Sequence, residues 1–105
     1  MKTSADLEAA LAASEDQPII IFKESATCPF SAAAQGEVTQ LKHDLPVYAL
    51  VVQYAKELSQ EIAEQLEVEH ASPQAIVVHR RKAVSHHWRT EISEDNLRKS
   101  VAEVA

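Results

Sequence analysis

The sequence predicts a single α/β domain, residues 1–105, with a four-stranded mixed sheet flanked by helices. Short apolar, β-branched runs alternate along the chain with segments whose apolar residues recur at helical spacing. The chain has 105 residues, of which 46% are hydrophobic, and it shows neither an internal repeat nor a flexible linker. This length and composition are typical of one small domain with a packed core.

The first part of the chain predicts a helix, a strand and a second helix. Ser4 is the candidate cap of the first helix, whose inner face carries Leu7, Ala10 and Leu11. The run PIIIF (18–22) is short and β-branched, as expected of a strand that is covered on both faces. Pro29 suits the first turn of the next helix, which continues through FSAAAQGEVTQL.

The middle of the chain predicts a strand, a helix and a hairpin. PVYALVV (46–52) is an apolar strand, and ELSQEIAEQLEV (57–68) follows as a helix with Leu58, Ile62, Ala63 and Leu66 on one face. PQAIVVH (73–79) and AVSHHW (83–88) are two further strands. The RRK stretch between them is expected to form a polar hairpin turn, although it lacks the usual glycine.

The last segment, SEDNLRKSVAEV (93–104), predicts a helix capped by Ser93, with Leu97 and Val101 on its inner face. The element order is therefore α-β-α-β-α-β-β-α. Strands separated by helices are expected to be parallel, and the final hairpin antiparallel, in a sheet with helices on both faces. This order resembles the thioredoxin-like fold with one extra helix in front.

The charge of the chain limits its partners. Ten basic and sixteen acidic residues give a net charge of -6, whereas a phosphate backbone requires a basic surface, so we expect no nucleic-acid partner. The N-terminal stretch is amphipathic and acidic, which is typical neither of a signal peptide nor of a membrane span. With its single cysteine, the chain is expected to be cytoplasmic and to have no membrane partner.

Cys28, the only cysteine, is expected where the first strand leads into the second helix. Chemistry in α/β folds concentrates at the carboxyl ends of parallel strands. A helix N-terminus adds about half a positive charge and unpaired backbone N–H groups, so the pKa of the Cys28 thiol should fall below about 8.5. Lys23, Thr27 and Ser31 are candidates for a further charge or donor. The alternative, a merely buried small residue, is disfavoured by the strand-Cys-Pro-helix context.

Ser31 stands where dithiol oxidoreductases carry a second cysteine. A serine can hydrogen-bond a thiolate but cannot attack a disulfide, so an external thiol must complete the reaction. Pro73 opens a strand directly after a helix. A cis Ser72–Pro73 bond there would place the backbone of residues 71–73 against the thiol, and this expectation comes from the fold rather than from the dipeptide.

Two segments together resemble the monothiol bacilliredoxins: IIIFKESATCPFSAAA (19–34) and ELSQEIAEQLEVEHASPQAIVV (57–78). The likeness runs through the whole chain. It implies a cytoplasmic thioredoxin-like protein that removes bacillithiol from oxidised proteins, with no cofactor, with bacillithiol as thiol co-substrate and with bacillithiolated proteins as clients. By position it implies Cys28 as the nucleophile, Pro29 and Ser31 as the rest of the motif, and Pro73 as the cis-proline.

The resemblance also has departures and open contacts. Phe30 stands where the family more often has isoleucine, which enlarges the apolar surface beside the thiol, and Glu67 stands where a glycine commonly ends the helix. Bacillithiol carries carboxylates, so cationic contacts are expected. Arg89 is the better candidate because the fourth strand runs back towards the thiol end, whereas the basic turn 80–82 should lie at the opposite end.

Three alternatives accompany this interpretation. Neighbouring histidines on a strand, such as His86 and His87, point to opposite faces, so no metal site is expected. A monothiol glutaredoxin-like iron–sulfur carrier has the motif C-G-F-S, but the chain has no glycine after Gly36. The third is a non-catalytic thioredoxin-like redox sensor or adaptor. Among the remaining residues, His70 is expected to hydrogen-bond its own loop, and Trp88 to pack on a helix.

Overall fold

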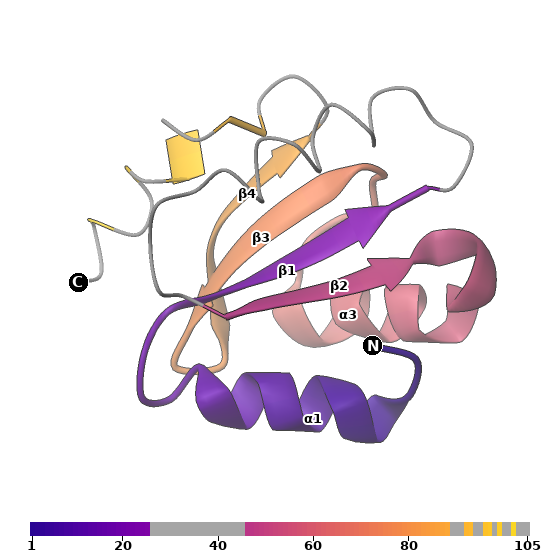
Figure 1. Ribbon diagram of the computed structural model, residues 1–105, viewed down its shortest axis with the longest axis horizontal. Coiled ribbons are helices and arrows are strands. Elements are labelled where there is room, and N and C mark those ends of the chain that lie inside the picture. The colour runs from indigo at the N-terminus through magenta and orange to yellow at the C-terminus, as the bar shows by residue number, and fades with distance from the viewer. Residues whose placement is uncertain (26–45, 89–91, 94–95, 98, 100–101, 103–105) are drawn as a thin grey trace.

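The computed structural model describes residues 1–25, 46–88, 92–93, 96–97, 99 and 102 (Figure 1). Its elements are, in chain order, α1 (Ser4–Ala13), β1 (Ile19–Glu24), β2 (Val47–Val51), the 3-10 turn η1 (Val52–Tyr54), α3 (Lys56–Leu66), β3 (Gln74–His79) and β4 (Lys82–Trp88). The helix predicted to follow Pro29 lies outside the described residues. Within the range of the last predicted helix, residues 96, 97, 99 and 102 are helical.

The strands form one mixed sheet in the order β2-β1-β3-β4. β1 is parallel to β2 and antiparallel to β3, and β3 is antiparallel to β4. The predicted mixed sheet and final hairpin are confirmed, but the expectation that β3 runs parallel to the earlier strands is wrong. α3 advances about 16 Å at about 1.5 Å per residue, and the segment 67–73 can span about 25 Å when extended. The chain therefore returns to the edge where β1 ends before β3 begins.

α1 begins with a capping box one residue before the predicted cap. The Thr3 hydroxyl accepts the Asp6 N–H at 3.3 Å, and the Asp6 carboxylate accepts the Thr3 N–H at 3.1 Å. The prediction of Ser4 as the cap is therefore wrong, because the residue before it has both the extended backbone and the side-chain oxygen that a cap needs. The predicted inner face of Leu7, Ala10 and Leu11 is buried.

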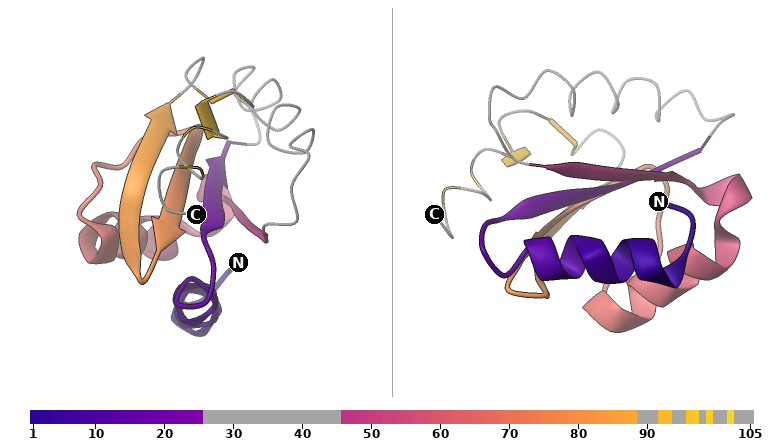
Figure 2. Two further views of the ribbon diagram at one scale, coloured as in Figure 1. Left: turned by 90° about the vertical axis from the view of Figure 1, so that its left-hand side faces the viewer. Right: turned by 60° about the horizontal axis from the view of Figure 1, so that its bottom comes forward.

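The core is divided between the two faces of the sheet. One cluster lies between the sheet and the helices α1 and α3 (Figure 2), and includes Leu7, Leu11, Ile19, Ile21, Ile62, Ile76 and Val78. The other consists of Ile20, Phe22, Ala75, Val77, Ile92 and Leu97. Successive β1 residues alternate between the two clusters, which explains why the run PIIIF is apolar at every strand position.

The β3–β4 turn is supported by the end of α1. Arg80 and Arg81 have φ values of 54° and 65°, in the left-handed region that two-residue hairpin turns require and that glycine usually supplies. The Ser14 carbonyl accepts the Arg80 N–H at 2.7 Å, and the Ser14 hydroxyl accepts the Arg81 N–H at 2.9 Å. The Arg81 guanidinium also pairs with Glu8 and Glu15. The glycine-free turn predicted from RRK is thus confirmed.

Two further helix ends agree with the sequence. The Ser93 hydroxyl accepts the Asn96 N–H at 3.1 Å, as predicted for the last helix, and Leu97 is fully buried. Val101, predicted on the same inner face, lies outside the described residues. Glu67 ends α3 with a left-handed φ of 54°, so a residue with a Cβ does occupy the position that favours glycine.

Within the described ranges, no helix is both long and apolar enough to cross a lipid bilayer.

Candidate functional site

Some of the predicted site residues lie in the part of the chain that the structure describes, and the others do not. Lys23, Ser72 and Pro73 lie in the described part of the chain. The others lie outside the described residues: Thr27, Cys28, Pro29, Phe30, Ser31 and Arg89. The described part of the site consists of the elements that lead towards Cys28 and Arg89, namely the ends of β1 and β4, and of the start of β3 beside them.

The register of the sheet brings three strand ends to one edge. Lys23 on β1 pairs with Gln74 on β3, and Gln74 pairs with Trp88 on β4. The end of β1, the start of β3 and the end of β4 therefore lie side by side (Figure 1). The expectation that the fourth strand runs back towards the end of the first is confirmed. The basic turn at Arg80 and Arg81 lies at the opposite end of the sheet.

The Ser72–Pro73 peptide bond is cis, as expected from the fold. Pro73 is buried and leads directly into β3 beside the end of β1. The Ser72 hydroxyl is buried and has no hydrogen-bond partner in the described part of the chain. This segment therefore brings backbone and an unpaired hydroxyl to the edge from which the chain continues towards Cys28.

Lys23 is a fully buried ammonium group on β1. Strand alternation places its side chain on the same face as Ile19 and Ile21, towards α3. Its Nζ donates to the Ser59 carbonyl oxygen at 3.2 Å and lies 3.2 Å from His70 Nδ1. Burial lowers the pKa of Lys23 to about 8, because removal from water disfavours the charged form.

His70 contacts Lys23 rather than the loop that carries it. Partial burial, followed by the positive charge of Lys23, lowers the pKa of the His70 imidazole below its usual 6.5. The ring is therefore neutral near pH 7, and we assign the proton to Nε2, which leaves Nδ1 to accept from Lys23. The expected loop contact is replaced because the segment 67–73 crosses the face into which Lys23 projects.

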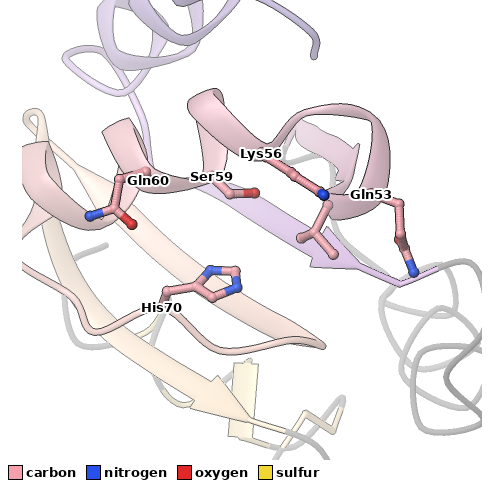
Figure 3. A pocket seen from close by; sticks show the side chains of 6 residues that line it. Gln53, Lys56, Ser59, Gln60 and His70 are labelled. Carbon is pink, nitrogen blue, oxygen red and sulfur yellow. The ribbon is translucent and has the colours of Figure 1, made fainter.

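Two hollows meet at His70. The α3 pocket has a volume of about 270 Å³ and is lined by Val52, Gln53, Lys56, Ser59, Gln60 and His70 (Figure 3). The β4 pocket has a volume of about 450 Å³ and is lined by Glu69, His70, Ala71, Ser72, Gln74, His86 and Trp88. Since His70 lines both, its ring stands between a hollow along α3 and a hollow against the end of β4.

The β4 pocket combines an indole with buried polar groups. Gln74 is 1% exposed and donates through Nε2 to the Glu69 carbonyl at 3.1 Å, while its Oε1 has no partner among the described residues. Trp88, expected to pack on a helix, lines this pocket and is 43% exposed. His86 is exposed and His87 half-buried, in agreement with their predicted opposite faces.

Sequence reasoning missed the surroundings of Lys23. It assigned the lysine to the neighbourhood of the thiol, and it did not include Ser59, His70 or Gln74 among the site residues. One signal was present: a lysine at the end of the apolar run IIIF must share a face with alternate isoleucines and so point into a covered layer. The identity of its partners follows only from the packing of α3 and the segment 67–73 on that face.

Comparison with known proteins agrees with this architecture. Residues 1–97 match the family model of the monothiol bacilliredoxin BrxC. A solved structure described as a candidate oxidoreductase with a thioredoxin fold is 27% identical, with a TM-score of 0.87 over 95% of this chain and 89% of that chain. The thioredoxin of Fasciola hepatica is 19% identical, with a TM-score of 0.74 and full coverage of both chains.

A reduced thioredoxin pre-protein of Schistosoma mansoni is 15% identical, with a TM-score of 0.79 over 100% of this chain and 95% of that chain. At such identities the likeness to the two thioredoxins concerns the fold alone. The predicted thioredoxin-like fold, with its mixed four-stranded sheet, is thereby confirmed.

Proposed function

The chain belongs to the monothiol bacilliredoxin family, and we propose that it removes bacillithiol from protein mixed disulfides through Cys28. Membership of this family and the likeness to a thioredoxin-fold oxidoreductase support a thiol redox function. The observation that carries the finer proposal is the family match over residues 1–97, a range that includes the lone cysteine and Ser31.

The proposed reaction proceeds through two thiol–disulfide exchanges. The Cys28 thiolate attacks the bacillithiol sulfur of a mixed disulfide, a new disulfide forms between Cys28 and bacillithiol, and the client leaves as a thiolate that takes up a proton. Ser31 cannot attack this disulfide. A second thiol, proposed to be bacillithiol, therefore attacks it, which releases bacillithiol disulfide and restores the Cys28 thiolate.

The supporting features lie at the edge where β1 ends. The chain leaves β1 at Glu24 and reaches Cys28 shortly after it, and the cis Ser72–Pro73 segment enters β3 at the same edge. Thr27, Pro29 and Phe30 flank the thiol in sequence, and Arg89 follows β4. We propose these residues as contacts of the small thiol or the client, and we propose that the buried Lys23 acts on the small thiol through its charge rather than by direct contact.

In the proposed reaction, bacillithiol acts as co-substrate and no cofactor takes part in the exchange. The partners are bacillithiolated proteins in the cytoplasm, without nucleic acid or membrane. The net charge of -6 supports the exclusion of nucleic acid, since a polyanion is repelled by such a surface.

The test is turnover of a bacillithiolated client protein by the full chain in the presence of free bacillithiol. We expect many client molecules to be released per molecule of enzyme, with a single bacillithiol adduct on Cys28 detected by intact mass. Cys28→Ser should abolish turnover and the adduct, whereas Ser31→Ala should retain both, because the serine is not the resolving group.

Two other outcomes would contradict the proposal. A single modification of Cys28 without turnover would instead identify a redox sensor or adaptor. An absorbing cluster formed with iron, sulfide and glutathione, together with absent turnover, would identify an iron–sulfur carrier.

A further inference from the structure

Lys23 is a buried cation whose contacts with other described residues carry no compensating charge. Its recorded partners are the Ser59 carbonyl oxygen and the His70 ring, both neutral groups. In the described part of the chain the ion pairs belong to Arg81, and the pKa of Lys23 is lowered by burial with no opposing carboxylate. Since an uncompensated charge is costly away from water, an anion that approaches this position is favoured.

The α3 pocket lies against this buried ammonium group, and none of the described residues that line it is acidic. Lys23 touches two of the residues that line it, Ser59 and His70. Figure 3 shows Lys56 and Ser59 on the α3 side and His70 opposite them, on the segment before β3. The chain as a whole has a net charge of -6, whereas the described lining of this pocket carries one lysine and no carboxylate.

A second feature of the pocket is an unpaired hydroxyl. Ser59 is 4% exposed, and its Oγ has no hydrogen-bond partner within the described ranges. A buried hydroxyl is ordinarily paired, so an unpaired one in a pocket wall is a donor that a ligand can satisfy after a small local movement. Lys56 lines the pocket at its surface, and Lys23 lies beneath the lining residues Ser59 and His70. Two positive charges and one hydroxyl donor are the groups that bind a carboxylate.

We propose that the α3 pocket binds a carboxylate of the small-thiol co-substrate. The identity of this occupant rests on the proposed function, whereas the preference for an anion rests on Lys23, Lys56 and Ser59. The bound carboxylate supplies the counter-charge that Lys23 lacks among the described residues and pairs with Lys56 at the pocket mouth. Lys56 and Ser59 are thus specificity residues for the small thiol, outside the thiol motif itself.

Anion binding can be measured without any thiol chemistry. In the full-length Cys28→Ser chain, we expect succinate to shift the NMR signals of the His70 ring in a saturable manner. It should also raise the pKa of His70, because a nearby negative charge favours the charged imidazole. Sodium chloride at the same ionic strength is the control for screening.

Variants assign this response to the pocket. Lys56→Gln should weaken succinate binding about two- to five-fold, as for an exposed ion pair, and Ser59→Ala should weaken it further when combined with Lys56→Gln. Lys82→Gln, which removes an exposed lysine at the far end of β4, should leave it unchanged. An equal response to chloride, a non-saturable shift, or unchanged binding in the double variant would overturn the proposal.

Kinetics of the wild-type thiol then identify the occupant. We expect succinate to compete with bacillithiol, and Lys56→Gln to raise the KM for bacillithiol about two- to five-fold without changing kcat. Saturable succinate binding without such competition would overturn the assignment to the small thiol. Turnover without any anion response would sink this inference and leave the proposed function standing. Anion binding without turnover would contradict the proposed function and the assignment to the small thiol, and it would leave only the preference of the pocket for an anion.

Discussion

Lys23 carries a positive charge into a layer of apolar side chains, most of them leucine and isoleucine. Its hydrogen bonds to Ser59 and His70 satisfy part of the ammonium group but do not neutralise it. Burial lowers the pKa of Lys23 from its usual 10.5 to about 8. A buried charge without an opposite charge beside it reduces the stability of the fold. Because Lys23 nevertheless occupies this position, next to the α3 pocket, we favour a role in binding over a role in packing.

This argument predicts the effect of Lys23→Met on stability. The unfolded chain holds the lysine proton up to about pH 10.5, whereas the folded chain releases it near pH 8, so wild-type stability should rise as pH increases between these values. Lys23→Met removes the buried charge and should stabilise the protein by about 1–3 kcal/mol at pH 7. The difference in stability between the variant and the wild type should become smaller towards pH 10, because the buried lysine of the wild type is then neutral.

Urea unfolding of both proteins from pH 6 to pH 10 provides the measurement. The pKa of His70 in the variant should also rise, because one cause of its lowering, the Lys23 charge, is absent. A variant that is less stable at pH 7, or a stability difference that does not depend on pH, would contradict the account of Lys23 as an uncompensated cation.

At the scale of elements, the end of α1 and the β3–β4 turn depend on each other. Ser14 is fully buried, and its hydroxyl donates to the Leu11 carbonyl at 2.6 Å while it accepts the Arg81 N–H at 2.9 Å. The left-handed φ values of Arg80 and Arg81 would be unfavourable in an unsupported turn. The leading helix thus stabilises the hairpin that aligns the end of β4 with the site.

Ser14→Ala should therefore destabilise the protein by about 1–3 kcal/mol, because it leaves the Arg81 N–H without its partner. Ser4→Ala is the matched control, since Ser4 is an exposed serine on the same helix whose hydroxyl donates to the exposed Glu61 carboxylate. Loss of such a solvent-exposed contact should change stability by less than about 0.5 kcal/mol. Thermal unfolding of the variants checks this. Equal stabilities for the two variants would show that the turn does not need α1.

At the scale of the whole molecule, the sheet separates two apolar layers and presents the α3 pocket on the α1–α3 side. The proposed anion site makes the stability of the entire fold dependent on ligand. At a succinate concentration ten times its dissociation constant, the Cys28→Ser chain should gain about 1.4 kcal/mol by mass action. A rise of several degrees in Tm is therefore expected.

Lys56→Gln should show a smaller rise in Tm at the same succinate concentration, and sodium chloride of equal ionic strength should not reproduce it. If succinate left the melting temperature of the Cys28→Ser chain unchanged at concentrations that saturate the His70 signal, the link between the pocket and the fold would be wrong.

Local sequence patterns predicted much of the architecture. The apolar run at 18–22 predicted a strand buried on both faces, the spacing of Leu7, Ala10 and Leu11 predicted the inner face of α1, and Ser93 was recognised as a cap. These features depend on neighbours within a few positions along the chain. The N-cap of α1 was misplaced by one residue because Thr3 and Ser4 have equivalent side chains for capping.

The sequence by itself determined the apolar inner faces of α1 and β1, the order of the described helices and strands, and the motif around Cys28, because periodicity and residue chemistry act locally. Only the tertiary structure decided that β3 runs antiparallel to β1, since the run 74–79 would be equally apolar in either direction. It also decided that Lys23 meets His70, 47 positions further along the chain. Such a contact depends on how α3 and the segment 67–73 pack on the sheet, and no local pattern specifies that packing.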